Sequence, residues 1–251
     1  MHYPITQKVC ALSGIVVIVL FGLAFWPTSM FLPPPAPTLT PIEVAALYQH
    51  NTVGIRIGML MMSLGGAFMG PLVAVIAIQM KRIEGATPIL AYTQMTTGTI
   101  GALFFIIPAL IFSAAAYHPE RAPELTALLH ELGWFFLVMP VGPAFLQNFA
   151  IGFAILKDKS VHPVFPRWLG FFNFWVALLF VAGGLITFFK TGPFAWNGLL
   201  AFWVALVVFG AWFFVMVVML LKAIDGQTKG GASASYNSTS GSIKKTQEER
   251  V

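Results

Sequence analysis

The sequence predicts an all-α polytopic membrane protein, a bundle of six transmembrane helices. Hydrophobic residues make up 58% of the 251 residues and charged residues only 9%, with a mean hydropathy of +0.83. A soluble domain carries about 25% charged residues, so this chain has too few to cover a surface that faces water. The single cysteine, Cys10, cannot form an internal disulfide. Soluble globular, disordered, coiled-coil and disulfide-rich secreted proteins are therefore excluded.

Six segments have the length and composition of membrane spans. A helix needs about 20 mainly apolar residues to cross a hydrocarbon core of roughly 30 Å. The segments that meet this requirement are Val9–Trp26, Val53–Ile78, Ile89–Ala116, Leu125–Leu156, Trp168–Phe189 and Gly198–Leu221. None alternates as a membrane β-strand would, and lipid offers no partner to an unpaired backbone group. Helices are the expected structure.

The positions of the basic residues predict the orientation, because Lys and Arg collect in cytoplasmic loops. With the amino terminus inside, only Arg56, Arg121 and Lys190 lie outside, which leaves 14 − 3 = 11 inside. The ratio is still 7 to 3 without the four residues from Lys229 onward. We expect both termini in the cytoplasm, in the inner membrane of a bacterium. Basic residues scattered over several loops give no nucleic-acid surface, despite the net charge of +5.

The first span, Val9–Trp26, is expected to be a retained helix. The alternative is a cleaved signal peptide, which would leave five spans in the same orientation. Six prolines in Pro27–Pro41 predict a stiff, extended spacer on the outer face. The segment Pro41–Asn51 then reads as a short helix, which either lies along the membrane interface or extends the second span.

The second span contains the pair Gly66 and Gly70, whose spacing lets another helix approach closely. The approaching helix belongs either to the same bundle or to a partner protein. The Gly70-Pro71 step predicts a kink. In the third span, polar side chains lie near the cytoplasmic end: Gln94, Thr96, Thr97 and Thr99. Threonine hydroxyls can donate hydrogen bonds to carbonyls of the preceding turn, so burying these threonines costs little free energy.

The fourth span is too long for a bilayer. Leu125–Leu156 has 32 residues, which is about 48 Å of helix at about 1.5 Å per residue. Pro140 and Pro143 predict a kink near its middle. Gln147 and Asn148 lie close to this kink. Burying an amide inside the membrane costs free energy unless it has a hydrogen-bond partner. Both side chains should therefore face the interior of the bundle, where they either form an interhelical hydrogen bond or line a cavity.

The composition changes abruptly after Leu221. Gly, Ser, Ala and Thr dominate residues 226–241, and the charged end of the chain has no apolar periodicity. The sequence therefore predicts a six-helix membrane domain over residues 1–222 and a disordered cytoplasmic tail over residues 223–251. Asn173 lies close to the cytoplasmic end of the fifth span, and Trp203 and Trp212 in the sixth are expected to be packing residues.

No catalytic motif is present. Every Asp and Glu lies in a loop, in the tail or at a span end, which disfavours a proton-coupled pump. The chain has no P-loop, no dinucleotide-binding glycine motif, no G-x-S-x-G elbow and no C-x-x-C pair. An enzyme is the less favoured class.

Ionisable residues gather at the predicted outer ends of spans two to four. They are His50, Arg56, His118, Glu120, Arg121, Glu124, His130 and Glu131. A His/Glu set can bind a divalent metal, and two opposed histidines a haem, so His50, His118 and His130 are candidate ligands. No two of them have ligand spacing on one helix. Solvated loop ends, with an Arg56–Glu131 pair, are the alternative.

The leading hypothesis is a non-enzymatic membrane protein that binds or passes a small, largely apolar molecule beside the kinked fourth span. Gln147 and Asn148 would be amide donors inside the cleft, with His130 and Glu131 at its outer mouth and Arg56 nearby. His130 and Asn148 are 18 residues apart, about five turns, so a straight helix would place them on one face. The alternatives are a metal- or haem-dependent redox enzyme and a scaffold subunit that meets its partner through Gly66 and Gly70.

Overall fold

The protein is a helical bundle. A computed structural model describes residues 4–248, with side chains described for residues 4–228. Among these residues six helices are long and apolar enough to cross a membrane: Pro4–Thr28, Thr52–Glu84, Ile89–Tyr117, Pro123–Lys157, Arg167–Thr187 and Leu199–Thr228. No strand occurs in the part described. The six predicted segments are therefore confirmed as helices, with ends shifted by a few residues.

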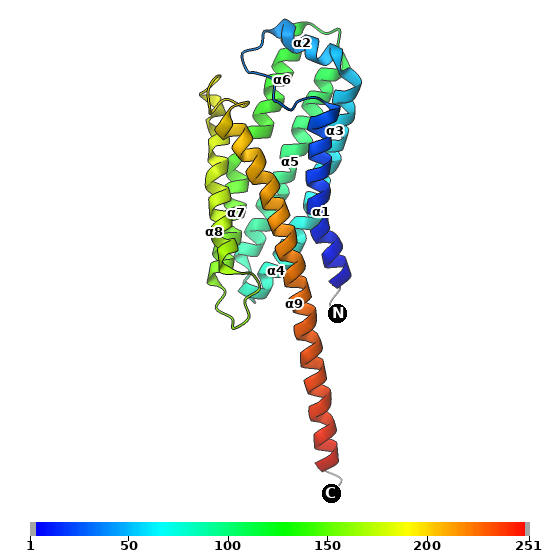
Figure 1. Ribbon diagram of the computed structural model, residues 1–251, viewed down its shortest axis with the longest axis vertical. Helices are drawn as coiled ribbons and strands as arrows, with labels where there is room; N and C mark the ends of the chain where they lie inside the picture. Colours follow the sequence, from blue (N-terminus) through cyan, green and yellow to red (C-terminus); the bar gives the residue numbers. More distant parts are fainter. Residues whose placement is uncertain (1–3, 249–251) are drawn as a thin grey trace.

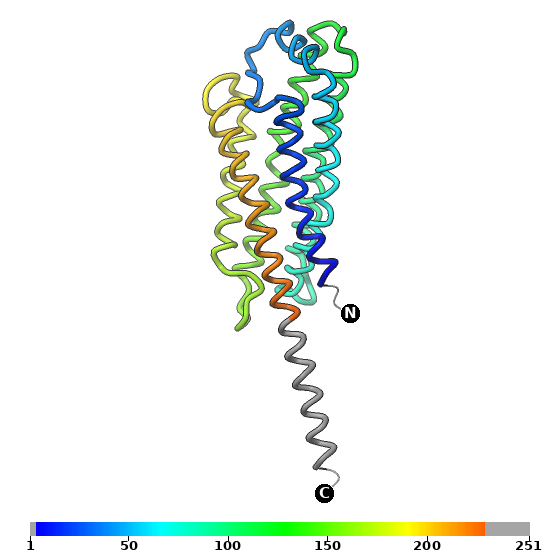
Figure 2. Tube along the Cα trace, turned by 45° about the vertical axis from the view of Figure 1, so that its right-hand side comes forward, coloured from blue at the N-terminus to red at the C-terminus, as the bar shows by residue number. Residues whose placement is uncertain are grey.

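The spans stand side by side, and two of them are broken into separate helices (Figure 1). In chain order they are α1 (Pro4–Leu23), α3 (Thr52–Ala67) with α4 (Met69–Glu84), α5 (Ile89–Tyr117), α6 (Pro123–Val138) with α7 (Val141–Lys157), α8 (Arg167–Phe180) and α9 (Ala205–Glu248). Helix α5 contacts α3, α4, α6 and α7. The start of α1 and the last part of α9 drawn in colour lie at the same end of the bundle, as Figure 2 shows. We call it the terminal end and the opposite one the distal end.

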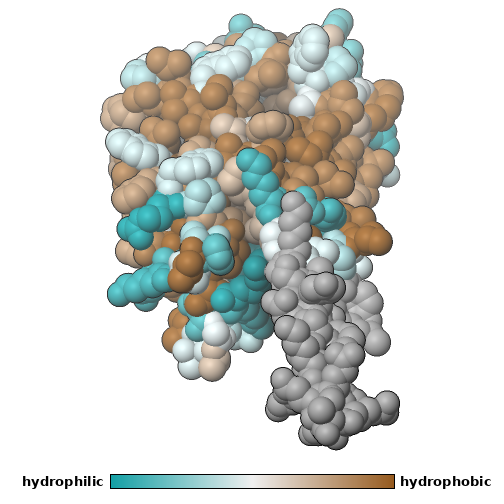
Figure 3. All heavy atoms as spheres, turned by 60° about the horizontal axis from the view of Figure 1, so that its bottom comes forward, coloured by the Kyte–Doolittle hydropathy of each residue, from teal (hydrophilic) through white to brown (hydrophobic). Residues whose placement is uncertain are grey.

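The flanks of the bundle are apolar. Large side chains such as Leu60, Trp175 and Val207 are 61%, 65% and 70% exposed. Hydrophilic residues gather instead at the terminal end, which Figure 3 brings forward. Exposed apolar patches of this extent mark a surface that is covered in its native setting. Six apolar helices with such flanks are consistent with an integral, multi-pass membrane protein.

The helices are interrupted close to both predicted kinks. The second span is interrupted at Phe68, three residues before Pro71, and the Ser13 hydroxyl of α1 donates to the Phe68 carbonyl at 2.9 Å. The same hydroxyl lies 2.7 Å from the Cys10 carbonyl, so Ser13 connects α1 to the break in the second span. The fourth span is interrupted between Val138 and Val141, at Pro140. Pro143 lies in the first turn of α7, where a missing N–H costs little.

The proline-rich linker and α2 (Pro41–His50) cover the distal end (Figure 1). Helix α2 begins with a capping box between Thr40 and Glu43, and hydrogen bonds from Thr40 lower the pKa of the Glu43 carboxyl. Asn51 leaves the helical conformation, with φ −132° and ψ 39°, so α2 is not an extension of the second span. The linker is not a free spacer either, because Phe31 is buried in the bundle and Trp196 Nε1 donates to the Pro35 carbonyl at 2.8 Å.

Polar contacts tie the terminal end together. Lys8 Nζ lies 2.6 Å from Asp225 Oδ1, and Gln79 Nε2 donates to Gln7 Oε1 at 2.7 Å. Ala223 and Ile224 are buried, so α9 packs on the bundle beyond the predicted domain end at residue 222. The disordered tail over 223–251 stays a prediction, and from residue 229 its side chains lie outside the described residues.

Gly66 and Gly70 do not form one packing face. A Cβ at Gly66 would lie 2.9 Å from Ile106 and 3.1 Å from the Ala102 carbonyl, so this glycine lets α5 approach. A Cβ at Gly70 would meet nothing within 4 Å. Gly66 is therefore used inside the bundle and is not free for a partner protein.

Candidate functional site

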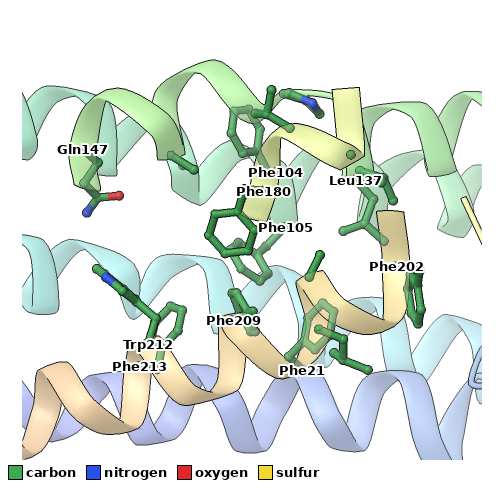
Figure 4. Close-up of a pocket in the computed structure, with 18 of the residues that line it drawn as sticks. Phe21, Phe104, Phe105, Leu137, Gln147, Phe180, Phe202, Phe209, Trp212 and Phe213 are labelled. Atoms are coloured by element: carbon green, nitrogen blue, oxygen red, sulfur yellow. The ribbon is translucent and has the colours of Figure 1, made fainter. Parts of the chain in front are cut away.

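A cavity of about 180 Å³ lies beside the break in the fourth span. Its wall takes residues from all six spans and is dominated by rings (Figure 4). They include Phe21, Phe104, Phe105, Phe180, Phe209 and Trp212. The cavity lies where the sequence predicted a cleft, next to Pro140.

Irregular backbone surrounds the cavity. Helix α8 tightens into the 3₁₀ helix η2 (Val181–Thr187), and a π-helix, η3 (Leu199–Val204), precedes α9. Gly183 of η2 and Phe202 of η3 both line the cavity, as does Pro140. At membrane depth, non-helical backbone is tolerated where it is buried in protein or lines a cavity. Three of the six spans are irregular at this level, which is the setting expected of a binding site.

Gln147 joins three helices through a chain of amides. Its Nε2 donates to Gln94 Oε1 at 3.3 Å, and Gln94 Nε2 donates to the Val73 carbonyl at 2.9 Å. Gly98 makes room for this chain, because a Cβ there would lie 2.6 Å from Gln147 Nε2. Gln147 thus makes the interhelical hydrogen bond considered from the sequence, and it also lines the cavity (Figure 4).

Asn148 carries an acceptor without a partner. The residue is 2% exposed and lines the cavity, and its Nδ2 donates to the Ala144 carbonyl at 2.8 Å. Among the described residues nothing donates to its Oδ1. The sequence suggested both amides as donors for a ligand. In the structure each amide nitrogen donates one hydrogen bond within the protein, and Asn148 Oδ1 has no partner among the described residues.

His130 is buried in a set of rings that we call the distal aromatic cluster: Phe31, Tyr48, Phe112, His130, Trp134 and Trp196. Trp134 Nε1 donates to His130 Nε2 at 3.1 Å, and the Tyr48 hydroxyl lies 3.0 Å from His130 Nδ1. Because indole N–H can only donate, His130 Nε2 is the acceptor nitrogen. The imidazole then carries its proton on Nδ1 and donates it to Tyr48.

The distal aromatic cluster separates the cavity from the distal end. Trp134 packs edge-on against Phe202 at 5.9 Å between ring centroids, and Phe202 lines the cavity. His130 is buried and is not among the residues that line the cavity, and both of its nitrogens have partners in the cluster.

The other predicted site residues lie apart from the cavity. Glu131 is exposed and borders a separate hollow of about 60 Å³ together with Lys190. The Arg56 guanidinium lies over the Tyr117 ring, 5.5 Å from its centroid. Within the part of the chain described, Arg56 and Glu131 form no ion pair.

The three candidate metal ligands are not brought together. His50 is exposed at the end of α2, and His118 Nδ1 lies 2.8 Å from Glu120 Oε1. His130 has both nitrogens occupied by Tyr48 and Trp134. Over the described residues, no group of three His, Cys, Asp or Glu side chains has a geometry that could hold a metal ion.

Sequence reasoning did not single out the aromatic lining. Phe104, Phe209 and Trp212 come from spans that were not suspected of forming the site. With 24 phenylalanines in the chain, no sequence signal separates a ring at a cavity wall from one in the core or one facing lipid.

The fold and the cavity define a class: an all-helical chain with six helices of membrane-spanning length around an apolar, ring-lined cavity. No protein-family model, curated protein or solved structure matches this chain.

Proposed function

We propose that this protein is an integral membrane protein that binds a small, largely apolar molecule in the cavity beside Asn148. The observation that carries the proposal is a ring-lined cavity whose lining residues include Asn148, a buried amide whose Oδ1 has no partner among the described residues. Ligand sites are mostly apolar concavities with a few convergent polar groups, and this cavity has that composition.

The size of the cavity supports a ligand built around one ring. An apolar cavity of about 150 Å³ in another protein takes up benzene, and the cavity described above measures about 180 Å³. A molecule of one ring with a short substituent would fill it. Larger ligands would require the wall to move.

The distal aromatic cluster favours binding over passage. A molecule moving from the cavity to the distal end would have to displace Trp134, which is fully buried and hydrogen-bonded to His130. Binding needs no such rearrangement.

The distribution of basic residues supports an orientation with the terminal end in the cytoplasm. Spans and loops at that end carry seven basic residues: Lys8, Lys81, Arg82, Lys157, Lys159, Arg167 and Lys222. Three, Arg56, Arg121 and Lys190, lie toward the distal end. By the positive-inside rule this distribution supports both termini in the cytoplasm, in a bacterial inner membrane.

Toluene binding tests the proposal. Purified protein in lipid nanodiscs is titrated with toluene, and uptake is compared with that of empty nanodiscs. We expect saturable binding of one toluene per protein. Ala144→Phe places a ring in the cavity and should abolish saturation, whereas Val207→Phe on the exposed side of α9 should not. Uptake that rises linearly, as in empty nanodiscs, would overturn the proposal.

A further inference from the structure

We infer that the hairpin formed by α7 and α8 carries a binding surface for an anionic phospholipid at the terminal end of the bundle. The headgroup phosphate would lie against Lys157, Lys159 and Arg167, and the acyl chains would lie along the exposed aromatic side of α8. This surface is separate from the cavity, so the inference goes beyond the proposed function and does not depend on it.

The three basic residues come together where α7 passes into α8. The two helices lie side by side (Figure 1), and a Cβ at Gly170 would lie 3.1 Å from the Gly152 carbonyl, so they approach closely near this end. Lys157 is the last residue of α7, Arg167 is the first residue of α8, and Lys159 lies in the loop between them. All three are exposed.

The loop does not neutralise these charges. Its one acid, Asp158, uses its carboxylate inside the loop, where Oδ1 accepts from the Ser160 N–H at 3.0 Å and Oδ2 accepts from the Val164 N–H at 2.9 Å. Among the described residues, no ion pair involves the three basic side chains. The charge of residues 157–167 is 3 − 1 = +2. Basic residues next to a membrane-spanning helix attract anionic headgroups.

Exposed rings continue from this basic group along α8. Arg167, Phe171 and Trp175 are spaced four residues apart, so they lie on one side of the helix. Phe171 and Trp175 are exposed, as is Trp168, which packs on Phe172. Trp175 lies about 12 Å along the axis from Arg167, within the roughly 15 Å of hydrocarbon in one leaflet. An acyl chain below a headgroup at Arg167 would therefore run beside these rings.

The combination of charge and rings selects the ligand. A soluble anion would gain nothing from the exposed rings, and the cation of a zwitterionic headgroup would be repelled by the basic group. Other basic residues of the terminal end contact the protein itself: Lys8 pairs with Asp225, and Lys81 lies over the Tyr92 ring, 4.5 Å from its centroid. The α7–α8 hairpin leaves its charges for a lipid.

Quenching of tryptophan fluorescence by brominated acyl chains tests the inference. The full-length protein is placed in phosphatidylcholine nanodiscs that contain a small fraction of brominated phosphatidylglycerol or of brominated phosphatidylcholine. We expect stronger quenching by the phosphatidylglycerol, because it would collect beside Trp168 and Trp175. Replacing both by phenylalanine should remove this excess, whereas Trp203→Phe, at an exposed position on another helix, should not.

Charge variants test the headgroup contact. Lys157→Gln together with Arg167→Gln should weaken the binding of phosphatidylglycerol by about 5-fold for each residue, and Arg167→Lys should keep it. Lys81→Gln together with Lys190→Gln removes the same charge at two other exposed positions and should change the binding less than about 2-fold. Circular dichroism verifies that each variant is folded.

Three results would overturn the inference. They are equal quenching by the two lipids, an excess that survives without Trp168 and Trp175, and equal effects of the two double variants. If sodium phosphate at constant ionic strength removes the excess, the surface binds a free anion and the assignment to a lipid is wrong. None of these results bears on toluene uptake, so the proposed function is tested separately.

Discussion

Buried polar groups in this protein fall into two kinds, and the difference decides what each residue does. His130, Gln94 and Asn173 have their hydrogen bonds made by the protein. Within the described part of the chain, Asn148 Oδ1 and Thr126 Oγ1 are buried without a partner, but only Asn148 lines the cavity. The paired groups stabilise the bundle, whereas Asn148 keeps an unpaired acceptor beside the cavity that we propose as the binding site.

Replacing His130 by leucine should lower the free energy of unfolding by about 2–4 kcal/mol, because it leaves the Trp134 N–H and the Tyr48 hydroxyl unpaired in the core. Unfolding in detergent followed by circular dichroism measures it. His118→Leu, at an exposed position, is the control and should stay within about 0.5 kcal/mol. Combining His130→Leu with Tyr48→Phe should cost less than the sum of the two. An additive result would show that the two residues do not interact.

Asp158 makes the loop after α7 sensitive to acid. Burial by itself raises its pKa, but hydrogen bonds from Ser160 and Val164 and the charge of Arg82 outweigh burial, and the pKa lies below its ordinary value. The fold therefore favours the carboxylate, and its stabilising effect is present above the unfolded pKa and lost as the pH falls through the folded one.

We expect the protection of the Ser160 and Val164 amides against hydrogen exchange to be constant from about pH 7 to 5 and to fall below about pH 4. Asp158→Asn should have low protection at every pH, since it removes the charged acceptor. Unchanged protection down to the lowest pH, or an Asp158→Asn variant that behaves like the unchanged protein, would contradict this role.

Helices and their interruptions follow from local sequence, whereas their mutual rotation does not. Apolar length predicts the six spans, and Pro71 and Pro140 predict the two breaks, because a proline lacks the N–H that continues a helix. On an unbroken fourth span, His130 and Asn148 would share a face. The break instead lets α6 direct His130 into the distal aromatic cluster while α7 directs Asn148 to the cavity.

The linker and α2 were likewise predictable as elements, but their packing was not. Their proline content and helical pattern are visible in the sequence. That Phe31 and Tyr48 are buried against α5 and α6 depends on contacts between residues far apart in the chain. Such contacts leave no periodic signal in the sequence, so the way the linker and α2 cover the distal end could not be predicted.

Gly152 tests the close approach of α7 and α8. A Cβ there would overlap the Phe174 ring and lie 2.9 Å from the Gly170 carbonyl. Gly152→Leu should therefore force the helices apart and lower the midpoint of thermal unfolding in detergent by more than about 5 °C. Gly142→Ala, where a Cβ meets nothing within 4 Å, is the matched control and should leave the midpoint unchanged or slightly higher. Equal effects of the two variants would contradict the observed packing.

The whole molecule has two ends of different charge, and this difference predicts its sidedness. In a Cys10→Ser background, single cysteines are placed at Glu120 near the distal end and at Lys159 near the terminal end, both exposed. A membrane-impermeant maleimide should label position 120 in intact cells and position 159 only after the membrane is opened. Labelling in the reverse order would place the termini outside the cell.

The central claim is that the cavity beside Asn148 receives a small apolar molecule from outside the protein. Photolabelling with a phenyl diazirine, followed by peptide mapping, tests it most directly. Labels that toluene displaces should map to peptides containing Phe104, Phe209 and Trp212 and should disappear in Ala144→Phe. Labels confined to exposed residues such as Leu60 and Val207, with no displacement by toluene, would contradict the claim.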